Sequence, residues 1–241
     1  MNKLFRNPRT RVRNLILVIL PFIILLGVFS YVSYSSIKGV ISNASGNNQK
    51  TVDYKKSIDS MGYYLRGNAT DLQVSYFNEL QDLINGGASD ADIAACVAKN
   101  YVADFYTWSN KNGSYDVGGM YYVHGPSKNV IIVQARNTYY KYLTYYINTF
   151  GSDKLLEVTN VETEVDPNPG VYSLDGKDYE CYSVFCRWEY KNGDTFEGMN
   201  ITSPNDEGTY WHYVDFATHE SFNVIKNDEG RFEIVDAIGD Y

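Results

Sequence analysis

An apolar run near the N-terminus constrains this chain more than any other feature. Leu15 to Val32 contains no charged residue and places Ile, Leu, Val and Phe on every side of a helix. A helix needs about 20 such residues to cross the hydrocarbon layer of a bilayer, whereas a helix of a soluble protein keeps a polar side. Residues 15–34 are therefore predicted to form a transmembrane helix that contacts membrane lipid.

Basic residues beside the run set its direction. Lys38 is the only cation soon after it, while the first 14 residues contain no acidic residue and five basic ones: Lys3, Arg6, Arg9, Arg11 and Arg13. Cationic flanks stay in the cytoplasm. We therefore expect residues 1–14 to form a cytoplasmic tail and the rest of this single-pass protein of the cell membrane to be extracytoplasmic.

A cleaved secretory signal is the alternative interpretation of the same run. Its apolar part is usually about 7–15 residues long and ends at a small-x-small cleavage site. Ser33-x-Ser35 matches that site weakly, and the run is longer than a signal needs. Retention as an anchor is the favoured prediction.

The outer part of the chain is acidic. After the five N-terminal cations are set aside, 16 Lys and Arg face 29 Asp and Glu, a formal charge of −13. Such a surface repels phosphates and argues against nucleic-acid binding. The acidity is interpreted as a solubility feature.

Cysteine and histidine spacing argues against a metal or a disulfide. Cys181 and Cys186 stand five apart in a predicted strand and therefore point to opposite faces, so they are not expected to pair; together with Cys96 they are predicted to be small core residues. His212, Asp215 and His219 form the only His/carboxylate cluster, and their spacing does not converge on a metal. No metal and no cofactor are predicted.

Residues 35–71 are rich in Ser, Asn, Gly and Lys and are predicted to be a stalk, with the folded extracytoplasmic domain at 72–241. Apolar residues at spacings of three and four predict a helix over 72–84, a second that begins at Ser89 and ends near residue 110, and a third from Ser127 to Gly151. The third carries Tyr139, Tyr142 and Tyr146 on one face.

From Leu155 the apolar period changes to two. Turn sequences separate candidate strands at 155–166, 179–190, 195–202, 209–217, 220–226 and 231–238. Asn-Gly and Glu-Gly turns between alternating runs are typical of antiparallel hairpins. Helices followed by such strands predict an α+β domain with the helices on one face of the sheet.

The final stretch, FNVIKNDEGRFEIVDAI over residues 222–238, joins two strands through an acidic-Gly turn. With the helices before it, this segment resembles the nuclear-transport-factor-2-like fold over residues 72–241. The resemblance implies a cone made by a curved antiparallel sheet wrapped over helices. It also implies a pocket at the open end, where some relatives bind small ligands and a few are enzymes.

The layout of one membrane helix and such a domain also resembles the bitopic assembly components of type IV secretion and conjugation systems. This resemblance is architectural, and no residue motif carries it. It implies an envelope scaffold that binds a protein partner or itself. We therefore expect a non-catalytic binding or assembly domain, with a tethered small-ligand-binding domain and an isomerase- or dehydratase-like enzyme as alternatives.

Five aromatic residues are the candidates for lining a pocket for a small apolar ligand: Tyr139, Tyr142, Tyr146, Trp188 and Trp211. A tyrosine suits this role because its ring packs while its hydroxyl bonds, although ordinary core packing explains the same pattern. For the enzyme alternative, Asp104 and Asp116 are the carboxylates nearest to aromatic residues. An exposed helix face and a turn cap are their respective structural interpretations, and Gly118-Gly119 is expected to permit an unusual backbone.

Overall fold

The computed structural model describes residues 54–191 and 216–238. The predicted tail, the predicted transmembrane helix, most of the predicted strands 195–202 and 209–217, and Trp211 lie outside these ranges. Among the described residues, none of the helices has both the length and the apolar character that a bilayer crossing requires. Residues 53–241 form one of two compact units of the chain, and the described structure belongs to that unit.

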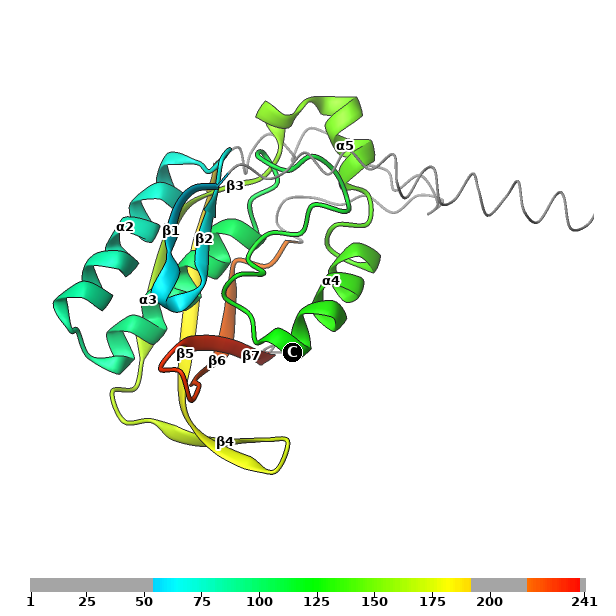
Figure 1. Ribbon diagram of the computed structural model, residues 1–241. Helices are drawn as coiled ribbons and strands as arrows, with labels where there is room; N and C mark the ends of the chain where they lie inside the picture. The colour runs from blue at the N-terminus through cyan, green and yellow to red at the C-terminus, as the bar shows by residue number, and fades with distance from the viewer. Residues whose placement is uncertain (1–53, 192–215, 239–241) are drawn as a thin grey trace, which may run out of the picture. The chain divides into compact units, whose positions relative to one another are not determined.

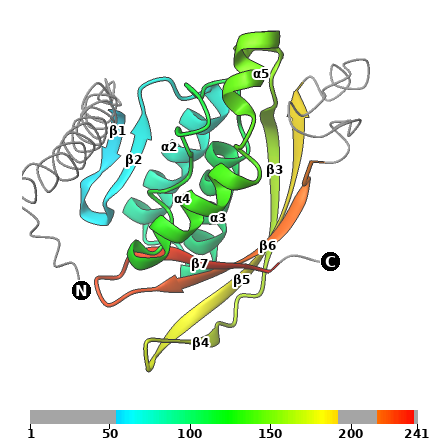
Figure 2. The ribbon, with the colours of Figure 1, turned by 90° about the vertical axis from the view of Figure 1, so that its right-hand side faces the viewer.

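The described unit consists of helices packed against an antiparallel sheet, which confirms the predicted α+β class (Figures 1 and 2). The helices are α2 (Asp71–Gly86), α3 (Asp90–Phe105), α4 (Lys128–Asn137) and α5 (Leu143–Phe150), with short 3-10 turns at η1 (Asp59–Met61), η2 (Gly125–Ser127) and η3 (Ser152–Lys154). The strands are β1 (Tyr54–Ile58), β2 (Tyr63–Arg66), β3 (Glu157–Val165), β4 (Gly170–Leu174), β5 (Lys177–Lys191), β6 (His219–Lys226) and β7 (Phe232–Ile238).

The main sheet runs in the order β3-β5-β6-β7, and β4 pairs with the start of β5. The turn at residues 227–230 joins β6 to β7 as the sequence predicts, with Gly230 at φ 77°. Strand β4 was not predicted. It is joined to β5 by Asp175-Gly176, whose φ values of 53° and 79° give the two positive dihedrals of a tight hairpin turn.

Helix α3 is the centre of the unit. Most of its residues are buried, because α2 packs on one side of it and the sheet on the other (Figure 2). Its start is fixed by Ser89, whose hydroxyl accepts a hydrogen bond from the backbone N–H of Asp92. Thr70 and Gln73 form a reciprocal capping box at the start of α2. Both caps agree with the helices predicted from the sequence.

The predicted stalk boundary at residue 72 is wrong for residues 54–66. These residues form the hairpin β1–β2, in which Tyr63 is fully buried and Leu65 is 4 % exposed. The Tyr63 hydroxyl donates a hydrogen bond to the carbonyl of Phe232, at 2.6 Å. The polar composition of this stretch hides a two-residue alternation of core side chains.

The third predicted helix is interrupted. Helix α4 ends at Asn137, Thr138 takes φ −122° and ψ −100°, and α5 starts at Leu143. The interruption lets the hydroxyl of Tyr140 donate to the carbonyl of Phe105 and that of Tyr139 donate to the carbonyl of Tyr106. These long-range bonds explain why a segment with the apolar period of one helix forms two helices.

The loop between α3 and η2 returns closely over α3, and this approach requires Gly118. A Cβ added there would lie 2.3 Å from the backbone oxygen of Asp104. We predict that Gly118→Ala lowers the free energy of unfolding by about 2 kcal/mol or more, because the loop or the helix must shift. Gly86→Ala is the control, since nothing lies within 4 Å of its added Cβ. Urea denaturation that finds both variants as stable as the parent would contradict the described loop packing.

Candidate functional site

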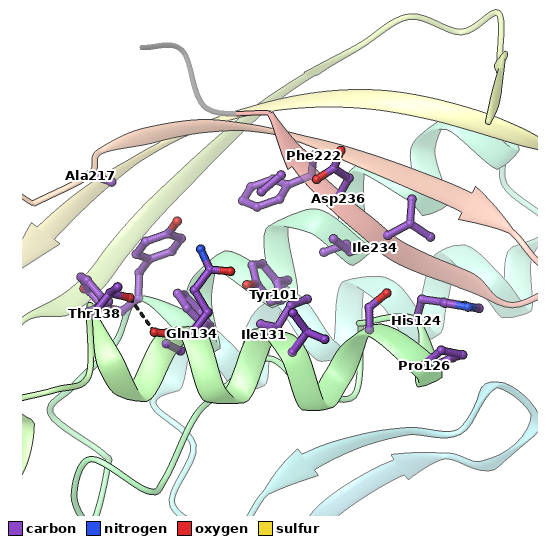
Figure 3. A pocket seen from close by; sticks show the side chains of 18 of the residues that line it. Tyr101, His124, Pro126, Ile131, Gln134, Thr138, Ala217, Phe222, Ile234 and Asp236 are labelled. Atoms are coloured by element: carbon purple, nitrogen blue, oxygen red, sulfur yellow. Dashed lines mark hydrogen bonds between the residues drawn. The ribbon is translucent and has the colours of Figure 1, made fainter. Parts of the chain in front are cut away.

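A cavity of about 680 Å³ lies between α4 and the strands β6 and β7 (Figure 3). Its volume falls within the range of pockets for small molecules, roughly 300–1,000 Å³. The end of α3 provides its floor through Tyr101 and Phe105, with Tyr106 next to them. The site therefore lies at the junction of the helical layer and the open edge of the sheet.

The walls are mostly apolar. From α4 the cavity is lined by Val130, Ile131 and Ala135, and from the sheet by Phe222, Ile234 and Ala237. The rings of Tyr101 and Phe222 meet edge to face, with centroids 5.3 Å apart. Tyr101 also stacks on Phe105 at 5.1 Å. Such walls favour flat or aliphatic groups over strongly hydrated ones.

Polar side chains interrupt this lining at several points. Gln134 points from α4 towards the sheet, and Asp236 projects from β7 on the opposite side (Figure 3). Asp175 reaches the cavity from the turn that joins β4 to β5. Both carboxylates belong to the rim, so the mouth of the cavity is negatively charged.

His124 and Pro126 close one end of the cavity. His124 Nδ1 lies 2.8 Å from Glu233 Oε2, and the Arg231 Nε atom lies 3.5 Å from the other oxygen of the same carboxylate. Glu233 is buried, so its charge is balanced by the guanidinium rather than by water. This arrangement fixes the orientation of the imidazole.

The structure separates the aromatic residues that the sequence groups together. Tyr139 lines the cavity, and its hydroxyl donates to Tyr106 while lying 3.4 Å from the hydroxyl of Tyr190. Tyr146 and Trp188 are buried outside the lining, Trp188 with its ring 4.3 Å from that of Tyr106. Tyr142 is half-buried beside Tyr146 and does not line the cavity either. Trp211 lies outside the described residues.

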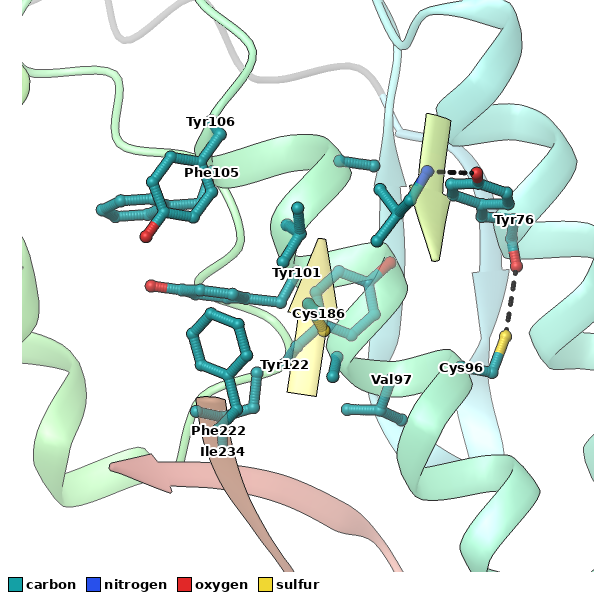
Figure 4. Packing of buried hydrophobic residues seen from close by; sticks show 14 of the residues in the cluster. Tyr76, Cys96, Val97, Tyr101, Phe105, Tyr106, Tyr122, Cys186, Phe222 and Ile234 are labelled. Atoms are coloured by element: carbon teal, nitrogen blue, oxygen red, sulfur yellow. Dashed lines mark hydrogen bonds between the residues drawn. The ribbon is translucent and has the colours of Figure 1, made fainter. Parts of the chain in front are cut away.

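The floor of the cavity is the part of the site that sequence reasoning missed. Tyr101, Phe105 and Tyr106 read as the packed face of a helix, and their rings do pack against the core (Figure 4). Their far edges nevertheless reach the cavity. Periodicity identifies a buried face but does not show where the packing opposite it ends.

Asp104 and Asp116, the candidate acid–base residues, belong to a buried group of charges. Asp104 lies 2.9 Å from the ammonium of Lys111 and accepts a hydrogen bond from the backbone of Gly119 at 2.7 Å. Arg66 lies 2.5 Å from Asp116 and 3.7 Å from Asp104. These four side chains, Arg66, Asp104, Lys111 and Asp116, are called the charge cluster below.

Electrostatics in the charge cluster oppose a catalytic role. Burial by itself raises the pKa of Asp104, but the charges of Lys111 and Arg66 outweigh it and lower the pKa to about 2. A general base that works near neutral pH needs the opposite shift. Burial lowers the pKa of Lys111 to about 8 against the attraction of Asp104, yet its side chain is fully buried and no substrate reaches it. A void beside Arg66 measures about 10 Å³, room for no more than one water.

The three cysteines are buried free thiols, as the sequence predicts. Burial raises the pKa of Cys96 and Cys186 to about 12, so neither is a thiolate at neutral pH. Among residues 54–191 and 216–238, no group of three or more His, Cys, Asp or Glu side chains is placed to hold a metal ion.

Comparisons with known proteins add no assignment: no family model, no curated protein and no solved structure matches the chain.

Acid should remove the stabilisation that the charge cluster provides. The pKa of Asp104 in the folded chain, about 2, lies below its ordinary value of 3.8, so its contribution is present above pH 4 and is lost as the pH falls towards 2. We predict that Asp104→Asn lowers the free energy of unfolding by about 3 kcal/mol at pH 7, because Lys111 and Arg66 lose a partner. The deficit should shrink by about 2 kcal/mol between pH 4 and pH 2.

Chemical denaturation at a series of pH values measures both effects. Asp82→Asn, which changes an exposed carboxylate on α2, is the control and should stay within about 0.5 kcal/mol of the parent. A deficit for Asp104→Asn that is the same at every pH would contradict the lowering of the Asp104 pKa by its partners.

Proposed function

We propose that this chain is a membrane-tethered binding protein whose outer domain holds a small, largely apolar molecule. The observation that carries the proposal is the cavity of about 680 Å³ between α4 and β6–β7, whose walls are mainly aromatic and aliphatic. Concave sites of this volume with mainly apolar walls are the usual form of small-molecule sites, which supports an occupant.

The tether in this proposal is the apolar run at 15–34, with the basic tail on the cytoplasmic side. The domain would then work close to the outer face of the cell membrane. A partly membrane-soluble ligand is readily available there, which agrees with an apolar cavity.

We further propose that the domain has a nuclear-transport-factor-2-like, cone-shaped arrangement. The order of helices followed by antiparallel strands supports this proposal, as does the position of the cavity between helices and sheet. Binding rather than catalysis is the preferred role, because Asp104 and Asp116 are both ion-paired.

Naphthalene is a suitable first probe, because it tests apolar capacity alone. We predict that it raises the melting temperature of a 53–241 fragment by about 3–5 °C at ten times its Kd. Gln134→Trp should abolish this rise, because the indole would occupy the cavity into which Gln134 points (Figure 3). Val133→Trp is the matched control on the same helix, since Val133 is 57 % exposed and does not line the cavity. No rise in the parent, or an equal rise in both variants, would contradict the proposal.

Assembly with a protein partner or a second copy is the second candidate, and the surface of α4 favours it. Ala135 is the only buried residue of this helix, while Val130 and Val133 are 67 % and 57 % exposed one turn apart. These two valines form a small exposed apolar surface that a partner would cover.

For this candidate we predict that cross-linking in membranes traps a complex of the full chain and that Val133→Lys loses it. Arg136→Ala, an exposed change on the same helix, should retain the complex. A chain that remains monomeric and uncomplexed in every case would exclude assembly through α4.

A further inference from the structure

Two tyrosine hydroxyls stand at the floor of the cavity. Tyr101 comes from the last turns of α3 and Tyr106 follows the helix end; they are 6 % and 8 % exposed, and both line the cavity. Figure 4 shows their hydroxyls pointing in the same direction. The rings are held in place by Phe105, Phe222 and Trp188, so the positions of the hydroxyls are fixed.

Neither hydroxyl forms a hydrogen bond with any described residue, and only burial and nearby charged or polar groups shift their pKa values. Three other buried tyrosines of the unit have hydrogen-bonded hydroxyls. The hydroxyls of Tyr63 and Tyr140 donate to backbone carbonyls, and that of Tyr76 accepts from the N–H of Val161. Neither hydroxyl is among the fully buried side-chain atoms that lack a partner, so both are open to the cavity, where a bound molecule can accept a hydrogen bond from each.

The surrounding charges define that partner further. Burial raises the pKa of both hydroxyls well above the ordinary value for tyrosine, and the carboxylate of Glu220 adds to the effect. Both hydroxyls are therefore protonated donors at neutral pH. Asp175 and Asp236 add negative charge at the rim. An anion is disfavoured there, although Arg231 and Lys128 lie towards the His124 end, where Arg231 is paired with Glu233.

We propose that the cavity binds an uncharged, ring-containing molecule whose carbonyl, hydroxyl or ether oxygen accepts hydrogen bonds from Tyr101 and Tyr106. The ring would lie among Phe105, Ile131 and Phe222, and the oxygen would point to the floor. This inference rests on the proposed binding function and adds the chemical class of the ligand to it.

Three probes with the same ring test the proposal: naphthalene, 2-naphthol and 2-naphthoate, which carry no oxygen, a neutral hydroxyl and an anionic group. Binding to the full chain is measured by equilibrium dialysis, with the same detergent on both sides so that its uptake of probe cancels. We expect 2-naphthol to bind about ten-fold more tightly than naphthalene, and 2-naphthoate to bind more weakly than 2-naphthol.

Tyr101→Phe and Tyr106→Phe remove one hydroxyl each and keep the rings. Each should weaken 2-naphthol binding about three- to five-fold and leave naphthalene binding unchanged. Because neither hydroxyl has a partner among residues 54–191 and 216–238, the melting temperature should not fall. Tyr76→Phe is the matched control: it removes a hydroxyl bonded to Val161, away from the cavity, and should lower the melting temperature without changing the ratio of the two affinities.

The outcomes distinguish a failure of the proposed ligand chemistry from a failure of the proposed binding function. Naphthalene that binds as tightly as 2-naphthol, or a ratio that survives both floor variants, overturns the proposed chemistry while the binding function stands. Tighter binding of 2-naphthoate than of 2-naphthol also overturns it. If none of the probes binds, the proposed function itself is lost.

Discussion

The described structure around the cavity depends on the ion pairs of Asp104. This carboxylate lies one residue before the end of α3, and it holds Lys111 and the backbone of Gly119 from the following loop. Arg66 adds the hairpin β1–β2 to the same group. Burying these charges is costly unless each is paired, so the loop, the helix and the hairpin are stable only together. The floor residue Tyr106 is positioned by that assembly.

A second set of contacts keeps the cavity open. The hydroxyls of Tyr139 and Tyr140 fix the segment between α4 and α5 to the end of α3. At the other end of α4, the backbone of His124 donates to Ile234 of β7, and Ile234 donates to Tyr122. Helix α4 is thus fixed at both ends while the helix itself contributes one buried residue, Ala135, from its last turn. A helix supported in this way spans a space that side chains do not fill.

Local sequence signals predicted the regular parts of the unit well. Helices α2 and α3 follow from their apolar periods and, for α3, from Ser89 at its start; β6 and β7 follow from alternation around an acidic-Gly turn. Predictions were wrong where a partner distant in sequence decides the conformation. Tyr63 is buried where its hydroxyl donates a hydrogen bond to the carbonyl of Phe232. The break after α4 is set by hydrogen bonds to the end of α3.

The candidate site shows the same limit. Tyr139 reaches the cavity, whereas Tyr142, Tyr146 and Trp188 do not line it. A helical or strand period gives the face on which a side chain lies, and core packing and pocket lining produce the same period. The sequence shows Asp104 as an acid–base candidate because aromatic residues lie near it in the chain. Only the positions of Lys111 and Arg66 show that its charge stabilises the fold.

The α+β class, the main helices and the closing hairpin follow from the amino-acid sequence, because these depend on neighbours within a few residues. The sequence also predicts the membrane anchor, since that prediction depends on one continuous apolar run and not on contacts with distant residues. The position of two tyrosine hydroxyls at the floor of one cavity follows from tertiary packing. Both hydroxyls face the cavity, with no hydrogen-bond partner among the described residues, because of how α4 and the sheet approach α3. That approach depends on contacts between residues far apart in the chain.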